Sequence, residues 1–123
     1  MMNVIRIRAS GTLVLPEPLM DEVISSESAG GSRMLEKCRN SIFTEMQLNT
    51  DSRVTFDISG NRLKTLIEIS GEDFSNLLVS AFKIICDTAL QIMADLKIDK
   101  DDFARILSIS DIHVLEIRGV QTT

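Results

Sequence analysis

The longest apolar pattern in the chain recurs with helical spacing between Ser70 and Leu96. Plotted at about 100° per residue, its polar residues fall on one narrow face, and apolar residues cover roughly two thirds of the circumference. A helix on a protein surface needs a narrower apolar stripe, so this helix should be covered on more than one side. The pattern predicts a central helix over residues 71–97. Its sheet-facing residues are expected to be Phe74, Leu78, Ile85 and Ile92.

One flank of this helix is expected to stay free for a second subunit, because a single sheet face should not cover the whole apolar arc. The two candidate flanks are Leu77, Ala81 and Ile84 on one side, and Val79, Cys86 and Leu90 on the other. Lys83, Asp87 and Asp95 interrupt the apolar run before it reaches about 18 uncharged residues, so a membrane span is not expected. A cap at Ser70 and Asp73 is expected to start the helix.

Strict alternation of apolar and charged residues surrounds Gly60-Asn61 and predicts a hairpin over residues 53–69. A two-residue loop fixes the register. It pairs apolar residues on one face, namely Ile58 with Leu63, Phe56 with Thr65 and Val54 with Ile67. It pairs opposite charges on the other face, namely Asp57 with Lys64 and Arg53 with Glu68.

The remaining patterns predict shorter elements. We expect a hairpin of residues 4–8 and 12–15 turning at Ser10-Gly11, a last strand over 112–120 after a break at 108–111, and a loop over 25–32. Short helices are expected near 18–25, 32–39 and 100–107. Residues 33–48 fit both a helical and a strand period, and our interpretation is a helix to Arg39 followed by a strand over 41–48.

This order of elements predicts one α+β domain over residues 1–123. Its architecture is a two-layer sandwich, with an antiparallel or mixed sheet of about five strands and the long helix packed across one face.

Composition narrows the possible partners. The net charge of −5 and the absence of Trp and Tyr argue against direct binding to nucleic acid, and the five Phe are expected in the core. Cys38 and Cys86 are far apart and have no CxxC partner, which indicates reduced thiols in a cytoplasmic protein. The N-terminal residues lack the apolar segment of a signal peptide.

Few residues offer catalytic or metal chemistry. His113 is the only histidine, so we expect neither a histidine metal site nor an acid–base pair of histidines. Asp99, Asp101 and Asp102 lack the Gly and Glu positions of a calcium loop and are better explained as helix caps. The sequence therefore predicts no enzyme, no cofactor and no metal.

Two classes of function remain. The preferred hypothesis is a non-enzymatic protein-interaction module, an adaptor, inhibitor or immunity-type protein that binds a protein partner through acidic residues, with a homodimer as one option. The candidate contact residues are Glu17, Asp21, Glu22, Glu27, Asp95, Asp99, Asp101 and Asp102. The alternative is a small-molecule-binding domain or minor enzyme with a pocket between the long helix and the sheet. Its candidate anchors are Arg6, Arg8, Arg118 and His113.

Overall fold

The structure is a computed structural model that describes residues 2–28, 33–48 and 51–120. Its elements are β1 (Met2–Val14), α1 (Glu17–Ser28), α2 (Met34–Glu45), β2 (Arg53–Ser59), β3 (Arg62–Gly71), α3 (Phe74–Asp95), the short 3₁₀ helix η1 (Lys100–Asp102), α4 (Phe103–Ile106) and β4 (Leu107–Val120).

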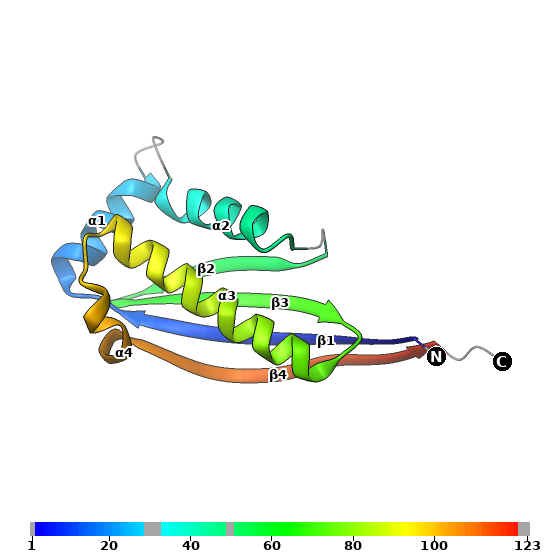
Figure 1. Cartoon of the computed structure of the whole chain (residues 1–123). Coiled ribbons are helices and arrows are strands. Elements are labelled where there is room, and N and C mark those ends of the chain that lie inside the picture. The colour runs from blue at the N-terminus through cyan, green and yellow to red at the C-terminus, as the bar shows by residue number, and fades with distance from the viewer. Residues whose placement is uncertain (1, 29–32, 49–50, 121–123) are drawn as a thin grey trace.

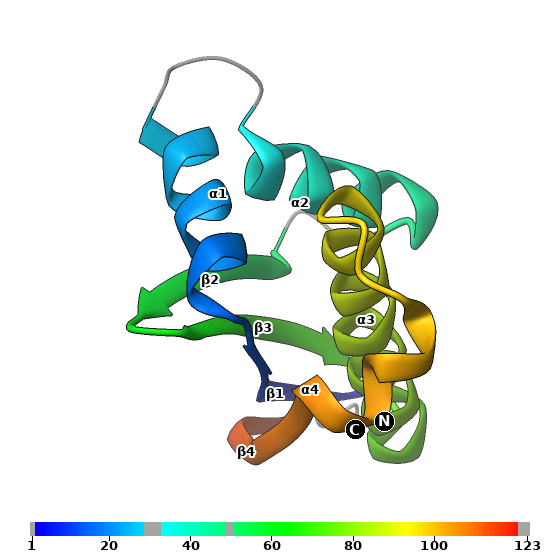
Figure 2. The ribbon, with the colours of Figure 1, turned by 90° about the vertical axis from the view of Figure 1, so that its left-hand side faces the viewer.

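The four strands form an antiparallel sheet in the order β2-β3-β1-β4, with α3 lying diagonally across one face (Figure 1). The end view shows α1, α2 and α3 stacked on that same face (Figure 2). Helices connect β1 to β2 and β3 to β4, so the topology is that of two interlocked β-α-β units, the ferredoxin-like arrangement. The predicted α+β class, with the long helix across an antiparallel sheet, is confirmed.

The hairpin of β2 and β3 has the predicted register at every pair. Val54 lies opposite Ile67, Phe56 opposite Thr65 and Ile58 opposite Leu63. Gly60 takes a φ of 60° in the two-residue turn, a left-handed conformation that other residues adopt at a cost. Turn chemistry and the alternating pattern therefore specify the same pairing.

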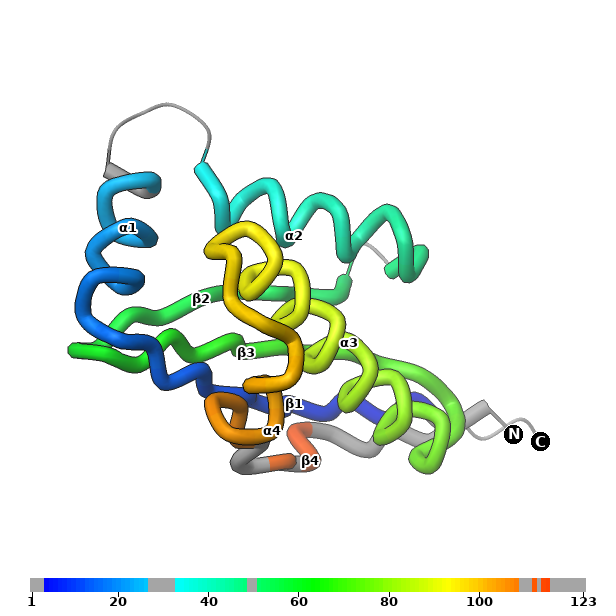
Figure 3. The backbone as a smooth tube through the Cα atoms, turned by 60° about the vertical axis from the view of Figure 1, so that its left-hand side comes forward, coloured from blue at the N-terminus to red at the C-terminus, as the bar shows by residue number. Residues whose placement is uncertain are grey.

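The core lies between α3 and the sheet. Ile84, Ile85 and Ile92 are at most 1% exposed and pack with buried residues of β1 such as Ile7 and Leu13. Figure 3 shows α3 crossing β3 and β1, with α1 at one end of the sheet. The predicted sheet-facing set is only partly right, because Ile85 and Ile92 are buried whereas Phe74 is exposed.

Residues 4–15 do not form the predicted hairpin at Ser10-Gly11. β1 is one continuous strand, and Gly11 pairs with Thr65 of β3. A Cβ at Gly11 would overlap the Cγ2 methyl of Ile85, so this glycine allows α3 to approach the strand closely. In the described part of the chain the sheet therefore has four strands, with β1 in its interior.

Residues 41–48 do not form the predicted strand either. α2 continues to Glu45 and buries Leu35, Cys38 and Ile42, which recur with helical spacing. Thr44, which the strand interpretation places on the same face as Ile42, is exposed. These residues fit both a helical and a strand period, and the packing of α2 against α3 stabilises the helix.

Several boundaries also differ from the prediction. α3 begins at Phe74, because the carboxylate of Asp73 accepts the N–H of Ser75 at 2.9 Å, whereas Ser70 is still in β3. α1 continues to Ser28, and residues 29–32 of the predicted loop lie outside the described part. β4 begins at Leu107 without a break at 108–111. Two register irregularities between β1 and β4 keep Ile112 and Val114 opposite Ala9 and Ile7.

Candidate functional site

The space between α3 and the sheet is filled by side chains. Besides the buried isoleucines, it contains Thr88, whose hydroxyl donates to the Ile84 carbonyl at 2.6 Å. Arg6 and Arg8, the anchors proposed for a pocket there, lie instead on the opposite face of the sheet, where they contact Glu68. Packing at this position is thus tight, and the polar anchors face away from it.

Arg6, Arg8 and Glu68 form a charged cluster on the face of the sheet that α3 does not cover. Arg8 donates to Glu68 Oε1 from Nε at 3.1 Å and from Nη2 at 2.7 Å, and Arg6 Nη2 donates to Oε2 at 3.0 Å. The register places the backbone of His113 opposite Arg8 and that of Arg118 opposite Val4. The side chains of His113 and Arg118 lie outside the described residues.

Hydrogen bonds from Arg8 and Arg6 hold the pKa of Glu68 below its usual value. The sequence pattern pairs Glu68 with Arg53, but the carboxylate has different partners in the structure. Arg53 is opposite Glu68 in register, yet the carboxylate pairs with the two arginines of β1. A carboxyl group with a lowered pKa is a poor general acid at neutral pH, so the cluster is better suited to holding strands together.

Replacing Glu68 by glutamine should lower the free energy of unfolding at pH 7 by about 1 kcal/mol. Because the folded-state pKa lies below the unfolded value, the wild-type contribution is complete above the unfolded pKa of about 4.3 and is lost as the pH falls through the folded pKa. Urea unfolding at a series of pH values should therefore show a smaller acid-induced loss for Glu68→Gln than for the wild type. Asp57→Asn, on the same face but outside the cluster, is the control and should change the free energy of unfolding at pH 7 by less than about 0.5 kcal/mol.

The predicted acidic contact residues gather around one end of the molecule. Glu22 of α1 and Asp95 at the end of α3 line one cavity of about 260 Å³, together with Lys37. Asp99 and Asp102 line another cavity with Leu19 of α1. The acidic set is Glu17, Asp21, Glu22, Asp95, Asp99, Asp101 and Asp102, whereas the side chain of Glu27 lies outside the described residues.

Basic residues are mixed among these acids, so the end is not a uniformly negative surface. Arg105 pairs with Asp102 at 3.1 Å, and Lys37 and Lys97 line the same two cavities. Asp99 caps η1 by accepting the N–H of Asp101 at 3.0 Å, as expected from the sequence. The role of these acids in partner binding stays a prediction.

Neither thiol is activated. Burial, together with Asp95 and Glu45, raises the pKa of Cys38 to about 12, and its Sγ donates to the Thr88 carbonyl at 3.8 Å. Burial and Asp87 raise the pKa of the half-buried Cys86. In the described ranges, no three His, Cys, Asp or Glu residues come together to hold a metal ion.

An apolar stripe remains exposed along α3. It consists of Val79, Phe82, Cys86 and Leu90, and we call it the α3 apolar face. The exposed fractions are 67% for Val79, 44% for Phe82 and 40% for Leu90. The other predicted flank, Leu77, Ala81 and Ile84, is buried in the core. Of the two candidate flanks, the structure therefore leaves only the one with Val79, Cys86 and Leu90 accessible.

The prediction that all five phenylalanines lie in the core is wrong for Phe82 and for Phe74 at the start of α3, because both are exposed. Helical spacing does place Phe82 on this flank, since it lies three residues after Val79 and four before Cys86. Val114 of β4, opposite Ile7 in register, adds a further exposed apolar side chain.

Length and composition alone would let α3 cross a membrane. It has 22 residues and a mean hydropathy of 1.6 in its most apolar window, but 44% of that window is buried inside the molecule. The core helix of a soluble protein meets the same criteria, so this is weak evidence for a membrane.

No known protein-family model matches the chain, and no curated protein sequence matches it either. The geometry of its surfaces is therefore the basis for a functional proposal.

Proposed function

We propose that this chain is a cytoplasmic, non-enzymatic protein-interaction module of the adaptor or inhibitor type, and that it forms a homodimer through the α3 apolar face. The observation that carries this proposal is the exposure of Val79, Phe82 and Leu90 at helical spacing on one side of α3. Soluble proteins rarely leave a continuous apolar stripe on a helix exposed to water unless another protein covers it.

The sequence of the face supports a second copy as its partner. When two copies of one helix pack antiparallel about a two-fold axis, each residue meets a residue equally far on the other side of the axis. An axis near residue 84 brings Phe82 against Cys86 of the second copy and Val79 close to Leu90. It also brings Lys83 close to Asp87 of the second copy.

Lys83 and Asp87 add electrostatic complementarity at the edge of this contact. Both lie on α3 beside the apolar face, where Lys83 is exposed and Asp87 is half-buried. Within the described residues no ion pair joins them to each other or to another side chain. Each is therefore free to pair across the dimer axis.

Sedimentation velocity tests the proposal. The wild type should sediment as a dimer at ~50 µM, and Phe82→Glu should shift it to a monomer, because dimerisation would desolvate an unpaired carboxylate. Asn76→Glu adds the same charge to an exposed position of α3 outside the apolar face and should leave the dimer intact. A wild type that is monomeric at this concentration would refute the homodimer.

Charge reversal tests the antiparallel geometry. Lys83→Glu and Asp87→Lys should each weaken the dimer, and the double variant should restore it, because the two positions exchange charges across the axis. Weakening by both single variants without restoration would contradict the antiparallel arrangement. Circular dichroism of each variant should show the wild-type helix content, since these side chains lie outside the core.

A further inference from the structure

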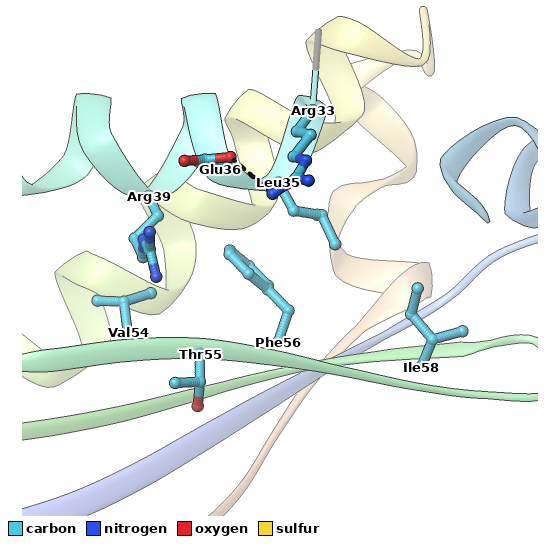
Figure 4. Close-up of a pocket in the computed structure, with 8 residues that line it drawn as sticks. All are labelled: Arg33, Leu35, Glu36, Arg39, Val54, Thr55, Phe56 and Ile58. Atoms are coloured by element: carbon cyan, nitrogen blue, oxygen red, sulfur yellow. Dashed lines mark ion pairs between the residues drawn. The ribbon is translucent and has the colours of Figure 1, made fainter. Parts of the chain in front are cut away.

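A groove runs along the outer edge of β2, beneath α2, and the sequence interpretation missed it because it placed a strand at residues 41–48. Figure 4 shows Phe56 projecting from β2 toward α2, with Arg39 of α2 reaching down toward Val54. The main cavity has a volume of about 540 Å³. Its lining residues are Arg33, Leu35, Glu36, Arg39, Val54, Thr55, Phe56 and Ile58.

The groove continues past the start of β2. A second cavity of about 310 Å³ shares Arg39, Val54 and Thr55 with the first and adds Arg53 and Phe43. The two together follow most of the length of β2. Leu35 and Val54 are buried at the floor, and Phe56 is half-buried. This floor offers apolar contacts to an extended chain.

The backbone of β2 is unpaired on the side of the groove. Among the described strands, β2 lies at the edge of the sheet and pairs only with β3. A two-residue turn makes Ser59 and Arg62 a hydrogen-bonded pair, and hydrogen-bonded pairs alternate along an antiparallel ladder. The N–H and C=O groups of Val54, Phe56 and Ile58 therefore point outward. A new strand could pair with all three.

Positive charge lines the groove without full compensation. Arg33 pairs with Glu36 at 3.6 Å, but among the described residues Arg39 and Arg53 have no ion pair. Glu68, which lies opposite Arg53, is already occupied by two other arginines. An occupant with acidic side chains would meet two available guanidinium groups.

We propose that the groove binds an extended acidic segment of a partner protein, which joins the sheet as a further strand beside β2. Its backbone pairs with Val54, Phe56 and Ile58, and its apolar side chains pack beneath α2. Because successive side chains of a strand alternate between its two faces, one carboxylate on the α2 side meets Arg39, and carboxylates on the opposite face meet Arg53. This site uses α2 and β2, whereas the proposed homodimer uses α3. The two proposals can therefore fail independently.

The probe is a synthetic peptide of about nine residues with both ends blocked, in which glutamate and valine alternate and one valine near an end is replaced by glutamate to meet Arg39. The amides of Val54, Phe56 and Ile58 should exchange rapidly in the free protein and slowly in the complex, whereas exchange at the already paired Thr55 and Asp57 should stay unchanged. N-methylation of alternate peptide bonds should weaken binding at least about tenfold, because it removes strand donors. Absence of binding at ~1 mM peptide, or equal binding of the methylated peptide, would overturn the proposal.

Charge reversal identifies the arginines. Arg39→Glu should weaken binding of the glutamate peptide at least about tenfold, and Arg39→Glu with Arg53→Glu should make the protein prefer a matched valine–lysine peptide. Lys37→Glu is the control, because Lys37 is exposed on α2 but lines a different cavity with Glu22. Unchanged binding by Arg39→Glu would overturn the charge assignment.

The same variants separate this site from the dimer. Phe82→Glu should leave peptide binding at its wild-type strength, and Arg39→Glu should leave the sedimentation coefficient unchanged. A change in the oligomeric state with Arg39→Glu would mean that a second copy of the chain occupies the groove, which would overturn the proposal of a separate partner segment.

Discussion

Replacing Gly11 by alanine should lower the free energy of unfolding by about 1–3 kcal/mol, because the added methyl group would overlap the Cγ2 methyl of Ile85. Alanine is otherwise favoured over glycine within a strand by about 0.5–1 kcal/mol, so the steric cost must exceed that gain. Urea unfolding followed by circular dichroism measures the difference.

The same substitution in an Ile85→Ala variant tests whether the loss of stability has a steric origin. Ile85→Ala should itself cost about 2–5 kcal/mol through the cavity it leaves. In that background Gly11→Ala should become neutral or stabilising, because the new methyl group enters empty space and the backbone gains its strand preference. If Gly11→Ala costs the same in both backgrounds, close packing of α3 on β1 is not the reason for the glycine.

Replacing Ile42 by alanine should cost about 2–5 kcal/mol, because its side chain is fully buried between α2 and the rest of the core. Thr44→Ala should change the free energy of unfolding by less than about 0.5 kcal/mol, since Thr44 is exposed and its hydroxyl bonds only to the Asn40 carbonyl at 3.0 Å.

This pair of substitutions also distinguishes helix from strand at residues 41–48. A strand would place Ile42 and Thr44 on the same face, so both substitutions would act on the core. In the helix they lie on different faces, and their effects should differ by more than about 1.5 kcal/mol. Comparable losses for the two variants would contradict the structure of α2.

The local elements with strong signals could be predicted from the sequence. The register of β2 and β3 follows from a two-residue turn and from matched apolar and charged pairs, which a shift by one residue would destroy. The helix α3 follows from a long periodic pattern. In both cases residues close together in the sequence are enough to specify the element.

The errors arose where a distant contact decides the structure. From the local sequence Gly11 resembles a turn residue, and only its contact with α3 shows why a glycine is needed within the strand. Residues 41–48 fit both a helical and a strand period, and only the packing of α2 against α3 selects the helix. The same limit applies to the candidate surfaces. The flank with Val79 and Cys86 could be named in advance, but the groove beside β2 depends on the correct assignment of α2.

The pairing of β1 with β4 also has a consequence for folding during synthesis on the ribosome. β1 is synthesised long before β4, yet one of its edges pairs with residues about a hundred positions later, from Leu107 to Val120. The hairpin of β2 and β3 can pair with the other edge of β1, and α3 can pack on the face of the sheet, while translation continues. Contacts this distant in sequence form slowly, so the nascent chain should expose an open strand edge until its last strand has emerged.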